Sequence, residues 1–274
     1  GKWSPGKAVK FGRPIRDKDH LATPLIDEDV IGVITLYDKV DKKPFTSFDQ
    51  EIMSTLSEQA VIAIKNAQLY KEQEKLTEGI IKSLATIVST RAKGVYLPRA
   101  SFLRIATLIG QRMRMSDREL KGVEYAILLH DAGQLVVPDE VLKKPAKLTG
   151  REYNLVKEHP VMGAEILKPM KSLKGIIPVI LHHHENYDGS GYPKGLKKDQ
   201  IPLGARIMAV VSAFEAMIAK RPYRTAKSMN AALEEMKVNS GTQFDPKVVQ
   251  ALLEVVGRQD VRAMLAKEKY GKHK

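Results

Sequence analysis

The stretch from Phe48 to Ala92 contains no proline and only one glycine, Gly79. Proline breaks helices and glycine weakens them, so this stretch predicts one helix of about 40 residues, against a mean of about 11–12. Its apolar residues recur at steps of three, four or seven and leave one face apolar throughout. They are Ile52, Leu56, Ile62, Leu69, Leu76, Ile80, Leu84 and Ile87. We expect a homodimer to cover this face through the coiled-coil-like helix 48–92; packing within the chain is the alternative.

The segment before this helix carries the strand signals. LATPLI (21–26) and IGVITLY (31–37) are apolar, rich in β-branched residues and separated by an acidic turn. Ser47 is the expected N-cap of the long helix, with Gln50 three residues later. The first 47 residues therefore predict a small α/β piece.

The remainder of the chain predicts helices and loops. Prolines separate amphipathic runs, and capping boxes are expected at Ser116–Glu119 and Thr149–Glu152. The fold class is thus mainly α, with an all-helical domain joined to the α/β piece by the long helix. The expected divisions are 1–47, 48–92, 93–258 and a basic tail, 259–274.

The amino-acid composition limits the kinds of ligand and metal site that the chain can form. The chain has no cysteine, so a metal has to be held by His, Asp or Glu. Its net charge of +13 favours a phosphate-bearing ligand, but no zinc finger, basic zipper or RNA-binding signature suggests a nucleic-acid polymer. No apolar run approaches the roughly 18–20 residues of a membrane span, and the N-terminus lacks the apolar core of a signal peptide. A cytoplasmic location is the simplest expectation.

Five of the seven histidines lie between residues 130 and 184. One precedes an aspartate at the end of the apolar run AILLHDAGQ, one precedes a proline in KEHP, and three stand together in HHHE. Imidazoles and a carboxylate suit a divalent transition metal, and a two-metal site activates water while holding a phosphodiester. As helical neighbours about 100° apart, His183 and His184 would reach one site from different angles, with His182 pointing away. These residues suggest metal-assisted phosphodiester hydrolysis.

The runs HDAGQ, KEHPVMGAEIL, HHHENYDGSGYPKGL, IPLGARIMAV and KRPYR, in this order, resemble the HD-GYP family of HD-domain phosphohydrolases over residues 80–255. The resemblance implies an all-helical domain that hydrolyses the bacterial messenger cyclic di-GMP to pGpG or GMP with iron or manganese ions. It also implies a surface that contacts diguanylate cyclase domains. Upstream, the run from LATPLIDEDVIGVITLYDK to EQAVIAIKNAQLY resembles the C-terminal half of a GAF sensor domain. The missing half suggests a fragment or a reduced domain.

The resemblance assigns roles to individual residues. Asp131 would bridge two ions and serve catalysis, and Arg221 and Arg224 would contact phosphate or guanine. Gly189 and Gly191 either belong to the ligand pocket or only form turns, and Arg221 either contacts ligand or caps a helix. The implied metal ligands are His130, Asp131, His159, His183 and His184, with Glu185 in support. The DGxGYP signature residues are Asp188, Gly189, Gly191, Tyr192 and Pro193.

Three positions depart from the family pattern. Ser101 aligns with a metal-binding histidine, and no Asp, Glu or His occurs between Gly79 and Ser116. Ser212 stands where an aspartate is expected, and Gln134 replaces a lysine suited to holding phosphate.

The two missing metal ligands, at Ser101 and Ser212, would both have bound the same ion. One ion would keep only His130 and Asp131, whereas the other would keep Asp131 and three histidines. We therefore expect one intact and one eroded metal site, and a signalling module that binds cyclic di-GMP with weak or lost hydrolysis. An active phosphodiesterase with Glu215 as substitute ligand is the alternative. A protein-interaction scaffold is a further one.

Overall fold

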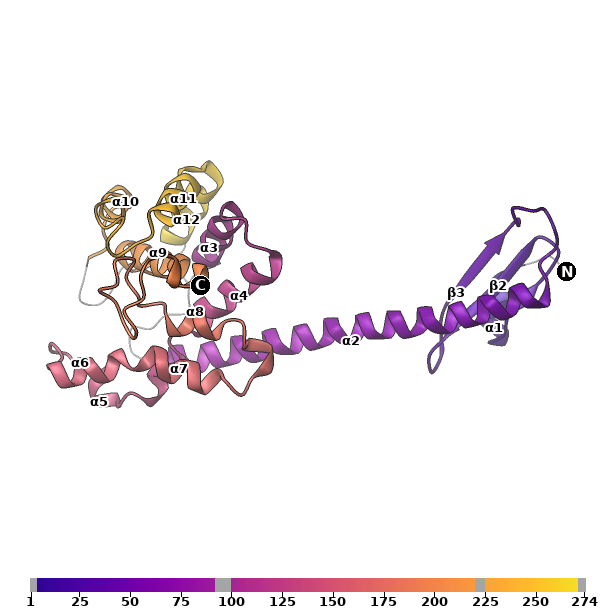
Figure 1. The fold of residues 1–274 in the computed structure, drawn as a ribbon, viewed down its shortest axis with the longest axis horizontal. Coiled ribbons are helices and arrows are strands. Elements are labelled where there is room, and N and C mark those ends of the chain that lie inside the picture. The colour runs from indigo at the N-terminus through magenta and orange to yellow at the C-terminus, as the bar shows by residue number, and fades with distance from the viewer. Residues whose placement is uncertain (1–3, 92–99, 220–224, 271–274) are drawn as a thin grey trace. The chain divides into compact units, whose positions relative to one another are not determined.

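The computed structural model describes residues 4–91, 100–219 and 225–270, which divide into two units, Gly1–Thr77 and Glu78–Lys274 (Figure 1). The first unit contains the short sheet and the second is helical, as predicted for a mainly α chain. Within the described ranges, no helix combines the length and apolar character needed to cross a membrane.

The first unit is built on an antiparallel sheet in the order β1-β2-β3. β2 (His20–Ile26) and β3 (Val30–Tyr37) confirm the two predicted strands, whereas α1 (Gly6–Phe11) and the two-residue β1 (Ile15–Arg16) had no clear signal. The strands differ in burial, since Leu21 is fully buried on β2 while β3 has no buried residue. Phe45 and Met53 pack with Leu21 as the core of this unit.

The predicted long helix is present as α2 (Ser47–Arg91), 45 residues in length. Its expected N-cap was wrong by one residue, because Thr46 and Asp49 make the capping hydrogen bonds. The Thr46 N–H donates to Asp49 Oδ2 at 2.6 Å, and the Asp49 N–H donates to Thr46 Oγ1 at 3.2 Å. Lys39 Nζ also lies 2.9 Å from Asp49 Oδ2, and these hydrogen bonds, that of the Thr46 N–H foremost, lower the pKa of Asp49 to about 2. The carboxylate thus has a cationic partner in addition to the helix end.

The second unit consists of α-helices and 3₁₀ turns. Both predicted capping boxes are confirmed, at the starts of α4 and α6. The segment expected as a basic tail begins with a helix, α12, that buries Val261 and Leu265 in the core. The α-helices are α3 (Ala100–Arg112), α4 (Asp117–Leu129), α5 (Asp139–Leu142), α6 (Gly150–Lys157), α7 (His159–Leu167), α8 (Ile177–Leu181), α9 (Leu203–Ile218), α10 (Met229–Val238), α11 (Pro246–Gly257) and α12 (Gln259–Tyr270). The 3₁₀ turns are η1 (Ala132–Val136), η2 (Lys171–Leu173) and η3 (Lys198–Gln200).

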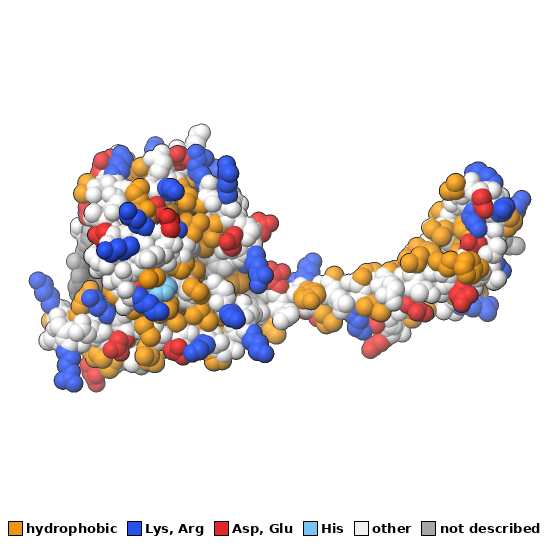
Figure 2. Space-filling model, viewed as in Figure 1, with side chains coloured by type: hydrophobic (Ala, Val, Ile, Leu, Met, Phe, Trp, Pro, Cys, Tyr) orange, Lys and Arg blue, Asp and Glu red, His pale blue; other side chains and the backbone are white. Residues whose placement is uncertain are grey.

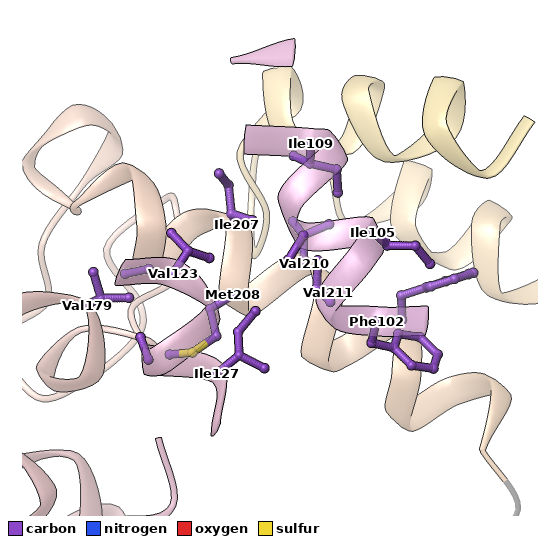
Figure 3. Packing of buried hydrophobic residues seen from close by; sticks show 14 of the residues in the cluster. Phe102, Ile105, Ile109, Val123, Ile127, Val179, Ile207, Met208, Val210 and Val211 are labelled. Carbon is purple, nitrogen blue, oxygen red and sulfur yellow. The ribbon is translucent and has the colours of Figure 1, made fainter. Parts of the chain in front are cut away.

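The core of this unit lies where α3, α4, α8 and α9 meet (Figure 3). The apolar residues of α3 recur at three- and four-residue steps, as a helix with one buried face requires. The Phe102 and Phe214 rings join α3 to α9, with centroids 6.2 Å apart. Gly204 lets the start of α9 pack closely, since a Cβ there would lie 2.9 Å from Val179 and 3.0 Å from Val123. This packing brings α4 and α8 together, and the rings of His130 and His183, which follow these helices, lie 5.3 Å apart between centroids.

Candidate metal centre

Three histidines follow helix ends, and each turns its Nδ1 atom back to the carbonyl three residues earlier. A carbonyl only accepts, so Nδ1 carries the proton, and in the neutral ring Nε2 keeps a lone pair that can bind a metal. Such hydrogen bonds also fix the orientation of metal-binding imidazoles. The pairs are His130 with Ile127 (2.7 Å), His159 with Val156 (2.7 Å) and His183 with Ile180 (2.6 Å).

The Nε2 atoms of His159 and His183 lie 3.3 Å apart. Two lone pairs that face each other at this distance repel unless a proton or a cation lies between them. Two nitrogens about 2.0–2.1 Å from one ion, with an angle at the ion between 90° and the tetrahedral angle, are about 2.8–3.4 Å apart. One ligand atom from each of His159, His183 and His184 can be chosen so that all lie within 4.8 Å. The three residues therefore fit a divalent ion.

The histidine triplet is not helical, contrary to the geometry assumed from sequence. α8 ends at Leu181, and His182 to His184 form the turn that follows. The turn brings the His183 and His184 rings to a centroid distance of 4.1 Å. His182 instead faces Glu185, with Nδ1 3.3 Å from Oε1.

Asp131 lies beside these histidines at the start of η1. Its Oδ2 is 3.2 Å from His130 Nε2, and its Oδ1 is 3.8 Å from His159 Nε2. Since His130 Nδ1 donates to a carbonyl, its Nε2 can turn a lone pair towards the carboxylate, as two ligands of one ion do. Gln134 donates from Nε2 to Asp131 Oδ1 at 2.5 Å, so the residue that replaces the expected lysine is bonded to the carboxylate.

Two glycines that the sequence analysis did not single out allow this approach. A Cβ at Gly133 would lie 1.9 Å from the His159 carbonyl oxygen and 2.6 Å from the Gly163 nitrogen. The backbones of η1 and α7 are therefore in contact, which is what places Asp131 next to His159. The sequence contains these glycines in HDAG and PVMG, but nothing in it indicates that the two segments are in contact.

Burial favours neutral, metal-binding imidazoles. Removal from solvent lowers the pKa of His159, lowers that of His183 well below its usual value, and lowers that of His184 to about 4. Neighbouring imidazoles act in the same direction, because a positive charge on one disfavours a charge on the next. At neutral pH these rings are uncharged and can donate lone pairs.

The loop after the triplet is held to the site by a buried carboxylate. Glu185 accepts hydrogen bonds from the Lys194 N–H at 2.8 Å and the Leu196 N–H at 3.1 Å. Gly191 is required by close backbone packing, since a Cβ there would lie 2.2 Å from the Asn186 nitrogen. Gly189 has φ +87°, a backbone conformation that side-chain-bearing residues rarely adopt. The backbone conformation of this loop therefore explains why both positions are glycine.

Tyr192 forms one wall of the site. Its ring stacks on His184, with centroids 4.9 Å apart and planes at 18°. Burial raises the pKa of Tyr192 to about 12, so the phenol stays neutral. The neighbouring Pro193 is exposed.

The other expected site residues lie elsewhere. Asp188 is exposed and accepts from the Ser190 N–H at 2.8 Å, so its carboxylate shapes the loop. Ser101 is fully buried on α3, whereas Ser212 and Glu215 are half-buried on α9. Arg221 and Arg224 lie outside the described residues.

Comparisons with known proteins find similarity in both parts of the chain. Residues 57–248 match the HD domain family and residues 10–64 match the GAF domain. The chain is 40% identical over 200 residues to the cyclic di-GMP phosphodiesterase response regulator RpfG of Xanthomonas campestris, covering 72% of this chain and 51% of that protein. It is 31% identical to the 3'3'-cGAMP-specific phosphodiesterase 2 of Vibrio cholerae, covering 78% of this chain and 43% of that protein. The chain thus spans about half the length, or less, of these relatives.

A solved structure supports the fold. A crystal structure of a cyclic GMP-AMP specific phosphodiesterase of Vibrio cholerae superposes with a TM-score of 0.53 at 22% identity, covering 68% of this chain and 50% of that one. The family match covers most of the chain, and the HDAG and DGSGYP runs lie inside it. The chain therefore belongs to the HD domain family, in its HD-GYP branch.

Proposed function

We propose that this chain binds a cyclic dinucleotide of the cyclic di-GMP type at a centre with one divalent metal, iron or manganese, and hydrolyses it weakly or not at all. The observation that carries the proposal is the contrast within the site. His159, His183 and His184 converge with Asp131 beside them, whereas two further ligand positions hold serines, Ser101 and Ser212. The relatives named for cyclic di-GMP and cGAMP phosphodiesterase activity support the ligand class.

The residues of the centre have distinct parts. The imidazoles of His159, His183 and His184 would hold the ion together with Asp131. When bound, such an ion polarises a phosphoryl oxygen as a Lewis acid. Gln134 offers only a neutral amide, already bonded to Asp131, where a lysine would offer a positive charge to phosphate. Tyr192, stacked on His184, would border the bound nucleotide.

Weak hydrolysis follows from the second set of ligands. His130 and Asp131 remain, but the serine hydroxyls at positions 101 and 212 are neutral and poor ligands for a divalent ion. If Glu215 on α9 supplies the missing carboxylate instead, two ions bind and the chain is an active phosphodiesterase. The two alternatives therefore differ in metal count.

Metal content is the experiment that separates them. We expect about one ion per chain after purification without chelator and reloading with ferrous iron or Mn²⁺, together with binding of cyclic di-GMP and little pGpG formation. Two ions with turnover would contradict the eroded site. Failure of the loaded chain to bind any cyclic dinucleotide would leave a protein-interaction scaffold, with a diguanylate cyclase domain as the first partner to test.

Restoring the lost ligands provides a second test. The double variant Ser101→His, Ser212→Asp should raise metal content towards two and increase hydrolysis. Because Ser101 is fully buried, circular dichroism should confirm that the variant folds, and Ser212→Asp alone avoids the buried position. A folded double variant that binds no additional metal would refute the assigned ligand positions.

We also infer a homodimer through α2, with the GAF-like piece 1–47 as its sensory input. Several large apolar residues of α2 are exposed, including Ile62 (52%), Leu69 (55%) and Leu76 (66%), which follow one another at seven-residue steps. Sedimentation should give twice the monomer mass, and the double variant Leu69→Glu, Leu76→Glu should give the monomer mass. An unchanged mass in this variant would exclude the helix as the interface.

A further inference from the structure

Lys157, at the C-terminal end of α6, is held between two aromatic rings. Its Nζ lies 5.1 Å from the centroid of the Tyr153 ring and 5.1 Å from that of Tyr192. Tyr153 precedes it by one turn on the same helix, and Tyr192 comes from the loop after the histidine triplet. An ammonium over aromatic faces is attracted by their quadrupoles, so both rings favour this position of the charge.

The charge of Lys157 is not neutralised by an acid among the described residues. Other lysines nearby in the sequence, in the loop before α6 and just after α7, have carboxylate partners. Lys144 Nζ lies 2.7 Å from Glu152, and Lys168 Nζ lies 3.1 Å from Glu165. Aromatic rings hold a cation without removing its charge, so the Lys157 ammonium remains able to bind an anion.

This cation stands at the edge of the histidine cluster. The Tyr192 ring that it faces is stacked on His184 at 4.9 Å. Together with the 5.1 Å from Nζ to Tyr192, this places the ammonium within about 10 Å of the His184 ring. In Figure 2 a His side chain is visible at the surface of this unit, beside Lys or Arg side chains.

We propose that Lys157 binds a phosphate of the ligand at this edge. The proposal rests on the proposed function, because a cyclic dinucleotide carries two phosphates, and an ion held by the histidines would leave anionic phosphate oxygens for a cation at this edge. Lys157 then supplies the positive charge that Gln134 does not offer. Tyr153 is a positioning residue, since it contacts the ammonium from the helix side and needs no contact with the ligand.

The test compares Lys157→Gln and Lys157→Arg with a matched control, Lys168→Gln, which directly follows the next helix, α7. Calorimetric titration of the Mn²⁺-loaded chain with cyclic di-GMP at several salt concentrations gives Kd and its salt dependence. We expect Lys157→Gln to weaken binding about tenfold or more and to flatten the salt dependence, because a charge-assisted contact is lost. Lys157→Arg should retain most of the affinity, and Lys168→Gln should stay within about twofold of the unmodified chain.

Tyr153→Leu tests the positioning role. It should weaken binding by a smaller factor than Lys157→Gln, and its effect should largely disappear when Lys157 is already Gln. Equal effects of Tyr153→Leu with and without Lys157 would show that the tyrosine does not act through the ammonium.

The outcomes separate this proposal from the one on which it rests. If the unmodified chain binds cyclic di-GMP and Lys157→Gln binds it with the same Kd and salt dependence, Lys157 has no ligand role and the proposed function stands. If the unmodified chain binds no cyclic dinucleotide, both proposals fall. A loss of bound Mn²⁺ in Lys157→Gln would show that the lysine supports the neighbouring His159, and would overturn the phosphate contact.

Discussion

The contact between η1 and α7 predicts that Gly133→Ala disables the metal centre although it replaces none of the metal-binding residues. The new Cβ would lie 1.9 Å from the His159 carbonyl oxygen, whereas Cβ atoms in real proteins essentially never approach within 3.0 Å. The two backbones would have to separate by about 1.1 Å. Metal–ligand distances tolerate only about 0.2 Å, so Asp131 and His159 would no longer serve one ion.

The energetic cost follows from the same distances. Overpacking costs about 1–3 kcal/mol, and the upper end applies because the obstructing atoms belong to the backbone. At about 2–4 °C per kcal/mol for a unit of this size, the melting temperature should fall by about 6–12 °C. The matched control is Gly150→Ala, which meets nothing within 4 Å at the first position of α6 and should leave stability unchanged or raised by up to about 1 kcal/mol.

The measurements are thermal unfolding by circular dichroism and bound Mn²⁺ per chain. We expect Gly133→Ala to lose both stability and metal, and Gly150→Ala to keep both. Unchanged melting temperature and metal content in Gly133→Ala would refute the close packing of η1 on α7, and with it the account of how Asp131 reaches His159.

Three further predictions concern the same unit. The pKa of His184 is about 4 in the folded protein and about 6.5 in the unfolded chain, so the unfolded state gains its proton first on acidification. Urea unfolding of chelator-treated protein should therefore show the free energy of unfolding falling between pH 6.5 and pH 4, by about 3 kcal/mol for this residue. A flat pH profile would contradict the burial of His184. Glu185→Ala leaves the Lys194 and Leu196 N–H groups without their acceptor, which should cost about 2–4 kcal/mol and speed tryptic cleavage of the loop, whereas unchanged cleavage would argue against this anchor. Thr149→Ala removes the N-cap of α6 and should cost about 1 kcal/mol in the same urea assay, and no loss would mean that the capping box contributes nothing.

Much of the fold was readable from local signals. The two strands, the long helix and both capping boxes depend on residues within a few positions of each other, and periodicity and cap chemistry report such contacts directly. The N-cap of α2 was misassigned because two overlapping patterns compete there. Thr46 with Asp49 prevails over Ser47 with Gln50, and Asp49 also binds Lys39, which the local pattern does not contain.

The residue types of the site could be predicted from the sequence, but their arrangement in space could not. A histidine in the sequence indicates a possible ligand, but the direction of its Nε2 depends on where the preceding helix stops. Likewise, nothing in the sequence joins Gly133 to the backbone of α7, or Lys157 to Tyr192, because these contacts form between segments that are brought together only by folding.

The hydrogen bonds from three imidazoles to helix-end carbonyls make the termination of those helices part of the coordination chemistry. One more helical turn at α4 or α8 would give the Ile127 or Ile180 carbonyl the backbone N–H of Asp131 or His184 as partner and would release the imidazole. At α6 the corresponding residue is Pro160, which has no N–H, so the Val156 carbonyl stays available to His159. Affinity for metal can therefore change without any change of ligand, through substitutions that lengthen or shorten a helix. In an engineered version of this centre, the helix stops would have to be copied together with the histidines.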